Sequence, residues 1–161
     1  MNIVWLVLGV VLVALVASMV YAFFVMRPRL ARQVHSSVAV IAEELHGREP
    51  LLIVPARCEG VSDSSRAALV GVGSLAVTEH GVVFGAGDPP RSLIIARNRI
   101  SSAAAENTFG AGETTVRKRD AMLVIRWLSA NDNESAAAFT VADPGALVAE
   151  LTPSKADQSG L

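Results

Sequence analysis

Cys58 is the only cysteine in the 161-residue chain, and its thiol is the most nucleophilic group that the sequence offers. A catalytic thiol needs a neighbouring base that lowers its pKa, and the stretch PARCEGV around Cys58 supplies Arg57 but no histidine. A single cysteine also excludes the intramolecular disulfides that are typical of small secreted domains. We therefore expect Cys58 to be a small buried apolar residue of a protein in a reducing compartment.

Two short motifs match ligand-binding patterns. GVGSLA, residues 71–76, has the glycine spacing that lets a nucleotide phosphate approach a helix N-terminus. Because Gly81 leaves no room for a helix after this motif, strand glycines explain it better. Glu43 and His46 are three residues apart, as in carboxylate-bridged metal sites, but no second helix carries a matching motif. The sequence therefore predicts no cofactor and no metal site.

The densest basic run is VRKRD, residues 116–120, which contains Arg117, Lys118 and Arg119. These three cations are able to contact the phosphates of a headgroup or an acidic partner. The acidic residues on both sides of the run also fit a solvated loop that has no ligand. Contact with an acidic partner is one hypothesis for the run, and a solvated loop is the other.

The remaining polar residues give no sign of catalysis. Serines are numerous, but none stands in a nucleophile elbow such as G-x-S-x-G, and no group is visibly activated. We therefore expect a protein that is not an enzyme and has no specific small-molecule ligand. The net charge of −1 arises from 14 basic and 15 acidic residues, so no positive field attracts nucleic acid. Nucleic acid is not an expected partner.

The elements that position these residues begin with an apolar N-terminal run. Residues 1–26 contain no charged side chain, and as a helix their apolar part is about 36 Å long at ~1.5 Å per residue. This length covers the ~30 Å hydrocarbon layer of a membrane, and the run is too long for the apolar core of a signal peptide. The sequence predicts a transmembrane helix over residues 1–26.

Three arginines, Arg27, Arg29 and Arg32, follow this run directly. Arginines near the end of a membrane span stay on the cytoplasmic side, and each can attract an anionic headgroup by about 1 kcal/mol. They predict a single-pass protein of the plasma (inner) membrane, with its N-terminus outside and its C-terminal domain in the cytoplasm. The expected partners are the lipid bilayer and other membrane-associated proteins.

Residues 27–50 are expected to form a juxtamembrane linker that is partly helical. Val34, Val38, Ile41 and Leu45 repeat at helical spacing between about residue 30 and residue 46. Such a stripe packs on the domain or lies along the membrane surface. Both positions are consistent with the pattern.

A mainly β domain of about seven short strands is predicted over residues 51–152, where runs rich in valine, isoleucine and leucine alternate with turn residues. Pro55 suggests that the first strand is an edge or contains a bulge. Asp143 and Pro144 are typical of the start of a helix, so a short helix closes the domain. Residues 153–161 have too little apolar surface to order themselves and are predicted to be a disordered tail.

Four stretches resemble a known family: GSLAVTEHGVVF, SLIIARNRISSAA, LVIRW and AFTVADPGALVAEL. They resemble the pleckstrin-homology-like (PH-like) superfamily, in particular its bacterial and GRAM-type variants, over residues 51–152. The resemblance implies a bent antiparallel sheet, capped at one open end by the C-terminal helix, that serves as a binding or scaffolding module. Phosphoinositide-binding members have a basic cluster in their first strands, where this chain has only Arg57 and Arg66, so headgroup binding by the domain is not expected.

These observations lead to two functional hypotheses. The first is a membrane-anchored cytoplasmic interaction or scaffolding module without catalytic activity, which binds partners through exposed strand edges or loops. The alternative is a small accessory subunit of a larger membrane complex or transporter, which contacts that complex through the transmembrane helix. Gly9, Ala14, Ala17 and Ser18 are small enough to let a second helix approach this segment closely.

Overall fold

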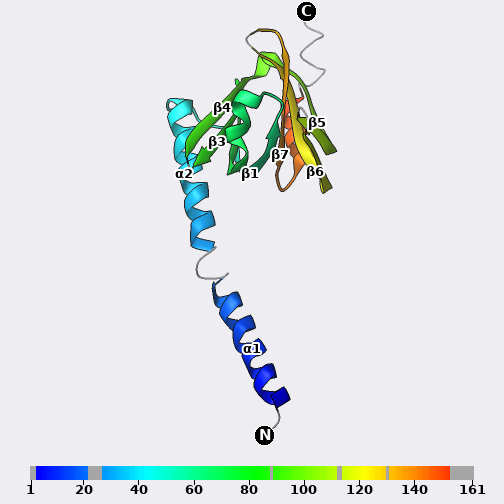
Figure 1. The fold of residues 1–161 in the computed structure, drawn as a ribbon. Helices are drawn as coiled ribbons and strands as arrows, with labels where there is room; N and C mark the ends of the chain where they lie inside the picture. The colour runs from blue at the N-terminus through cyan, green and yellow to red at the C-terminus, as the bar shows by residue number, and fades with distance from the viewer. Residues whose placement is uncertain (1–2, 22–26, 88, 112–113, 130, 153–161) are drawn as a thin grey trace, which may run out of the picture.

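The computed structural model describes residues 3–21, 27–87, 89–111, 114–129 and 131–152. Two helices precede seven strands, and a third helix follows them (Figure 1). The helices and strands are α1 (Ile3–Tyr21), α2 (Arg27–Leu45), β1 (Leu52–Val61), β2 (Gly71–Thr78), β3 (Gly81–Gly87), β4 (Pro90–Ala96), β5 (Ile100–Ala111), β6 (Thr114–Leu128), β7 (Glu134–Thr140) and α3 (Pro144–Leu151), with short 3-10 turns η2 (Ser64–Leu69) and η3 (Arg97–Arg99).

The structure describes the apolar N-terminal helix α1 over Ile3–Tyr21, which is part of the run that predicted a membrane span. In the part of the chain that the structure describes, no helix is both long and apolar enough to cross a membrane. The predicted transmembrane helix over residues 1–26 is therefore wrong; residues 1–2 and 22–26 of that prediction lie outside the described residues.

The predicted membrane location depended on this span and is therefore wrong as well. A single-pass protein of the inner membrane, with an outer N-terminus and a cytoplasmic C-terminal domain, is not supported. Arg27, Arg29 and Arg32, which were expected to set that topology, lie in the first turns of α2. The fold class is corrected accordingly: it is a mainly β domain with a C-terminal helix, without the transmembrane element.

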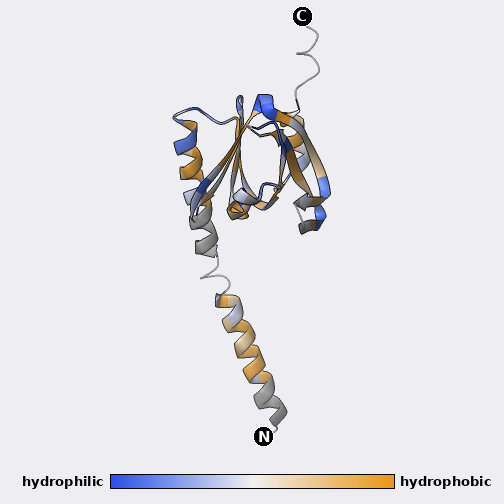
Figure 2. Cartoon of the chain, turned by 45° about the horizontal axis from the view of Figure 1, so that its top comes forward, coloured by the Kyte–Doolittle hydropathy of each residue, from blue (hydrophilic) through white to orange (hydrophobic). Residues whose placement is uncertain are grey.

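The seven strands form one antiparallel sheet in the order β4-β3-β2-β1-β7-β6-β5. The sheet curls into a half-barrel, with β4 and β5 as its two outermost strands (Figures 1 and 2). β1 joins the two halves because it pairs with β2 along its first part and with β7 along its second. The half-barrel is thus open between β4 and β5.

Two prolines lie where the ladder can spare a backbone donor. Pro55 pairs with Ser74 of β2, but the pairing of β1 with β7 starts only at Arg57, so β1 has a single neighbour at Pro55. Pro90 is the first residue of β4, an outermost strand. Since proline cannot donate to a ladder, both positions are ones that it tolerates.

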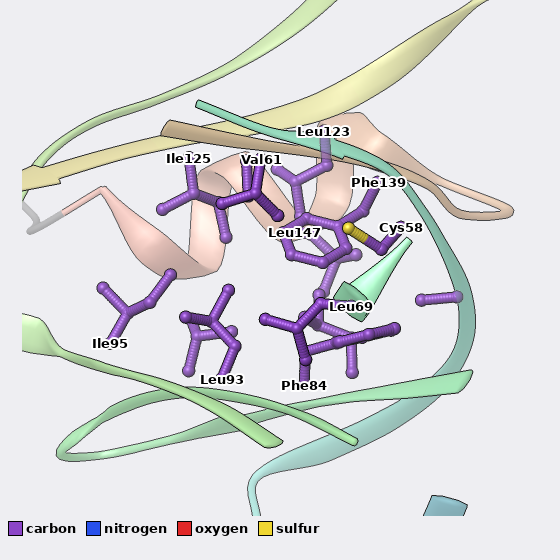
Figure 3. Packing of buried hydrophobic residues seen from close by; sticks show 14 of the residues in the cluster. Cys58, Val61, Leu69, Phe84, Leu93, Ile95, Leu123, Ile125, Phe139 and Leu147 are labelled. Carbon is purple, nitrogen blue, oxygen red and sulfur yellow. The ribbon is translucent and has the colours of Figure 1, made fainter. Parts of the chain in front are cut away.

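The concave side of the half-barrel holds the main core. Phe84 of β3 and Phe139 of β7 meet there with their ring centroids 5.2 Å apart. Leu147 of α3 lies between the two halves of the half-barrel (Figure 3). Leu147 and Leu151 are both buried. The Asp143 carboxylate accepts a hydrogen bond from the Ala146 amide (2.9 Å) and so caps α3. α3 therefore closes part of the core that the curled sheet leaves open.

The convex side of the sheet is covered at two places. Ile41 and Leu45 of α2 pack on Ala76 and Val83, which lie on the outer face of β2 and β3. At the other half, Phe109 of β5 packs on Met122 and Val124 of β6 and on Ala138 of β7. Both α2 and the end of the β5–β6 hairpin thus bury apolar outer faces.

Candidate interaction site at the open edge of the sheet

A cavity of about 600 Å³ lies where η3, the start of β5 and the end of α3 meet. Its apolar lining includes Ile100, Ala103 and Leu151, and its polar lining includes Arg97, Ser101 and Thr152. Apolar walls with a few polar groups are typical of sites that take an apolar group and fix its orientation. The cavity is therefore our candidate site.

Short local contacts hold the walls of this cavity together. The Arg97 amide donates to the His80 carbonyl (2.7 Å), which ties η3 to the β2–β3 turn. The Arg97 guanidinium donates through Nη2 to the Glu150 carbonyl (2.7 Å), which ties η3 to the last turn of α3. Thr152 ends that helix by donating its Oγ1 to the Val148 carbonyl (2.8 Å). Segments about 50 residues apart in the sequence are thus fixed around one opening.

The strand at this opening has a free edge. In the described part of the chain, β5 is the last strand of the sheet and pairs with β6 alone, over a register from Ile100↔Trp127 to Ala111↔Thr114. In an antiparallel ladder, alternate residues direct their backbone N–H and C=O groups away from the partner strand. The outer side of β5 therefore presents backbone groups that a further strand can pair with.

Among the described residues that line the cavity, Arg97 is the one with a charged side chain. Arg97 and Arg99 lie in η3, and in the described residues neither forms an ion pair with a carboxylate. The hydrogen bond from Arg97 to a carbonyl uses one donor of a guanidinium that has five. Arg97 therefore retains donors for an acidic group that enters the cavity.

The basic run that the sequence singled out lies elsewhere. Arg117, Lys118 and Arg119 belong to β6, so the solvated-loop interpretation is wrong for their backbone. Arg117 pairs with Thr108, eight residues along β5 from the cavity-lining Ile100, or roughly 25 Å at ~3.3 Å per residue. The structure does not bring these residues to the cavity, and their contact with an acidic partner stays a prediction.

One member of this run is already neutralised. Lys118 Nζ lies 3.1 Å from Glu59 Oε1. The same Glu59 oxygen accepts a hydrogen bond from Thr140 Oγ1 (2.8 Å) and lies 3.6 Å from Arg57 Nε. Glu59 is the extra residue at the irregularity of β1 between Cys58 and Gly60, and Lys118 lies where the β5–β6 register shifts. This cluster therefore fixes two strand bulges to one another across β7.

Cys58 is buried, as the sequence predicted. Burial raises the pKa of its thiol to about 12, although a hydrogen bond to the Gly60 carbonyl opposes the shift; Glu59 adds to it. A thiol with this pKa carries almost no thiolate near neutral pH. Cys58 therefore acts as part of the core.

The motif GVGSLA and the pair Glu43 and His46 also have structural roles. Gly73 lies in β2, and a Cβ at this position would lie 2.2 Å from the Gly85 carbonyl oxygen, so the motif GVGSLA serves close strand packing. Glu43 lies in α2, whereas His46 follows its end with φ 50° and its Nδ1 is 2.8 Å from the Glu44 carbonyl oxygen. Among the residues described, no group of three or more potential metal ligands gathers.

The sequence did not point to the cavity itself. The cavity forms where the start of β5 meets the end of α3, and these segments are remote in the sequence. The only local signal was the pair of arginines next to Ile100. Comparison of the chain with protein-family models, with curated proteins and with solved structures found no match.

Proposed function

We propose that this chain is a non-catalytic PH-like interaction module that binds a partner protein through the free edge of β5. The observation that carries the proposal is the position of the 600 Å³ cavity directly beside the unpaired edge of the outermost strand. Backbone pairing along an edge supplies affinity, and a pocket beside it supplies side-chain specificity. A curled antiparallel sheet with a helix at its open end supports the PH-like part of the proposal.

The chemistry of the cavity favours binding over catalysis. Its hydroxyl groups belong to serine and threonine residues, and no imidazole or carboxylate lines it within the described part of the chain. A hydroxyl nucleophile needs such a base within hydrogen-bond reach. The Cys58 thiol is not an alternative nucleophile, because it is buried and its pKa is about 12.

Site-specific crosslinking tests this function. A photoreactive benzoylphenylalanine at Ser101, which is exposed and lines the cavity, should crosslink to a discrete partner in cells that produce the full chain. The same group at Ala39, an exposed position of α2, is the matched control. The partner must then bind the purified chain directly, and Ser101→Trp must weaken this binding. Equal crosslinking from both positions, or binding that Ser101→Trp leaves unchanged, would contradict the proposal.

A further inference from the structure

The two outermost strands differ in how well their edges are protected. β4 begins with Pro90, and Ser92 in its middle donates to a Glu44 carboxylate oxygen of α2 (2.5 Å), so that a helix lies against this end of the sheet. Prolines and covering helices are devices that prevent strand addition. β4 is therefore a poor acceptor for a further strand.

β5 has no proline, and the helix that contacts it, α3, lies at the cavity beside the start of the strand. The sequence of β5, ISSAAAENTFGA, contains no lysine either, and most of its side chains are small. Its one charged residue, Glu106, is held by Arg126 of β6 in a two-point contact, with distances of 2.7 Å and 3.0 Å. Small side chains and a neutralised charge leave the backbone edge of β5 accessible to another strand.

Positive charge lies near both ends of β5. Arg97 and Arg99 immediately precede the strand, and Arg117 and Arg119 lie on β6 beside its far half. If two copies of the chain paired antiparallel through β5, these basic ends would face each other, which is unfavourable. The charge pattern favours an acidic partner strand over a second copy.

From these observations, and resting on the proposed function, we infer that the partner of β5 is an acidic extended peptide segment. One of its apolar side chains enters the cavity between Ile100, Ala103 and Leu151, and a carboxylate one or two positions away meets Arg97. The segment pairs with β5 through its backbone. The expected ligand is therefore a peptide in which an acidic residue lies close to an apolar one.

Selection of peptides tests this inference. A displayed library of random linear 12-residue peptides is panned against the immobilised full chain and, in parallel, against the Arg97→Glu variant. Peptides selected by the unmodified chain should contain an apolar residue within two positions of Asp or Glu. Their Kd should rise at least about tenfold with Arg97→Glu, since a charge-assisted hydrogen bond is lost. Arg48→Glu, the same change at an exposed site on the α2–β1 connection, should leave Kd unchanged.

The mode of binding is tested on the peptide and not on the protein. Methylation of alternate backbone nitrogens in a selected peptide removes the donors that pair with a strand, so one of the two methylated series should lose binding by at least about tenfold. Ser101→Trp should block the cavity, whereas Ala39→Trp should not. These variants change exposed positions and leave the buried core intact.

The outcomes separate the two proposals. Selected peptides that bind with no acidic preference, or whose Kd is unaffected by Arg97→Glu, overturn the acidic-segment inference but keep a β5 interaction module. Peptides that are unaffected by Ser101→Trp and by backbone methylation overturn both. Failure to enrich any peptide over a library panned on a blank surface also counts against both.

Discussion

At the scale of single residues, the groups that look most reactive in the sequence have structural roles. Cys58 is the clearest case, because its thiol lies in the core beside Phe139 (Figure 3) and donates to the Gly60 carbonyl (3.8 Å). Its buried state follows from the alternation of the first strand, which the sequence displays. Its pKa of about 12 follows from packing, which the sequence does not display.

The thiol should therefore react slowly in the folded chain. The pKa of Cys58 is raised from 9.0 to about 12, so the thiolate fraction near pH 8 should be ~1000-fold lower than in the unfolded chain. Reaction with a disulfide reagent, followed by absorbance, should be slow in buffer and fast in denaturant. Rapid labelling of the folded protein would show that Cys58 is accessible.

The same shift makes stability depend on pH at the alkaline end. Because the folded pKa is raised, the thiol contributes stability that is complete below pH 9 and is lost as the pH rises towards 12. A Cys58→Ala variant has no thiol, so its free energy of unfolding should change less between these values than that of the unmodified chain. Denaturant titrations at several pH values measure the difference.

Glu106 and Arg126 form a half-buried ion pair with two contacts, at 2.7 Å and 3.0 Å. A side-chain hydrogen bond from Arg126 holds the pKa of Glu106 below its ordinary value. A lowered folded pKa means that this stabilisation is present above pH 4.5 and is lost as the pH falls through the folded pKa. Glu106→Gln should cost roughly 0.5–1 kcal/mol at pH 7 and less at a pH below the folded pKa of Glu106. A cost that is the same at both pH values would exclude the ion pair as its cause.

At the scale of secondary-structure elements, α2 is part of the folded domain. Ser37 of α2 and Ser74 of β2 are fully or almost fully buried, and their hydroxyl oxygens are 2.8 Å apart. Ser37 donates to the Val34 carbonyl (2.7 Å), so Ser74 is the donor between the two hydroxyls. The helix is thus fixed to the sheet by a polar contact inside an apolar interface.

The Ser37 and Ser74 hydroxyls should be energetically coupled. Removing either one should lower the free energy of unfolding by more than half of the loss that follows from removing both. Ser37→Ala leaves the Ser74 hydroxyl buried without this acceptor and should cost about 1–3 kcal/mol of unfolding free energy. In the double variant no unpaired donor remains, so the two single costs should exceed the combined cost by roughly 1 kcal/mol. Denaturant unfolding of the four proteins gives this coupling, and a value of zero would mean that the hydroxyls act independently.

The close approach of α2 to the sheet also requires a glycine. A Cβ on Gly85 of β3 would lie 2.7 Å from the Ser37 carbonyl oxygen and 2.9 Å from Ile41 Cγ1. Gly85→Ala should therefore displace α2 and cost about 1–3 kcal/mol. Gly110 is the matched control in β5, because a Cβ there meets nothing within 4 Å. Similar stabilities for the two alanine variants would show that α2 is not packed against Gly85.

The elements were predictable to different degrees. The hairpin around Gly81 and the start of α3 at Pro144 carry strong local signals, namely a turn residue between alternating strands and a helix cap. A solvated loop was one of the two hypotheses for the basic run at 117–119, because its charge suggested solvent, whereas these residues lie in β6. A charged residue is usually exposed to solvent, but an exposed residue can belong to a strand as well as to a loop.

The apolar run at the N-terminus shows the opposite failure. Composition gives the length of an uncharged segment, but it does not by itself show that the segment forms a membrane-spanning helix. The structure describes this helix over Ile3–Tyr21. In the described chain no helix meets the requirement for a span, and the membrane location derived from residues 1–26 does not stand.

At the scale of the whole molecule, the half-barrel leaves one edge open and places a cavity beside it. This arrangement depends on the sheet order, which puts β4 and β5 at opposite ends, and on α3, which closes part of the gap. Hydrophobic alternation predicts that strands exist, but it does not predict which strand is outermost. The position of the cavity could therefore not be predicted from the sequence, because it depends on the order of the strands in the sheet.

The most direct test of the account is a solution NMR measurement of β5 in complex with a selected acidic peptide. If the peptide adds to the sheet, Hα–Hα and amide nuclear Overhauser effects should connect it to residues 100–106 in the pattern of a strand ladder. The peptide's apolar side chain should show contacts with Ile100 and Leu151. Contacts confined to β4, to α2 or to the β6 arginines, with β5 unaffected, would contradict the proposed interaction site.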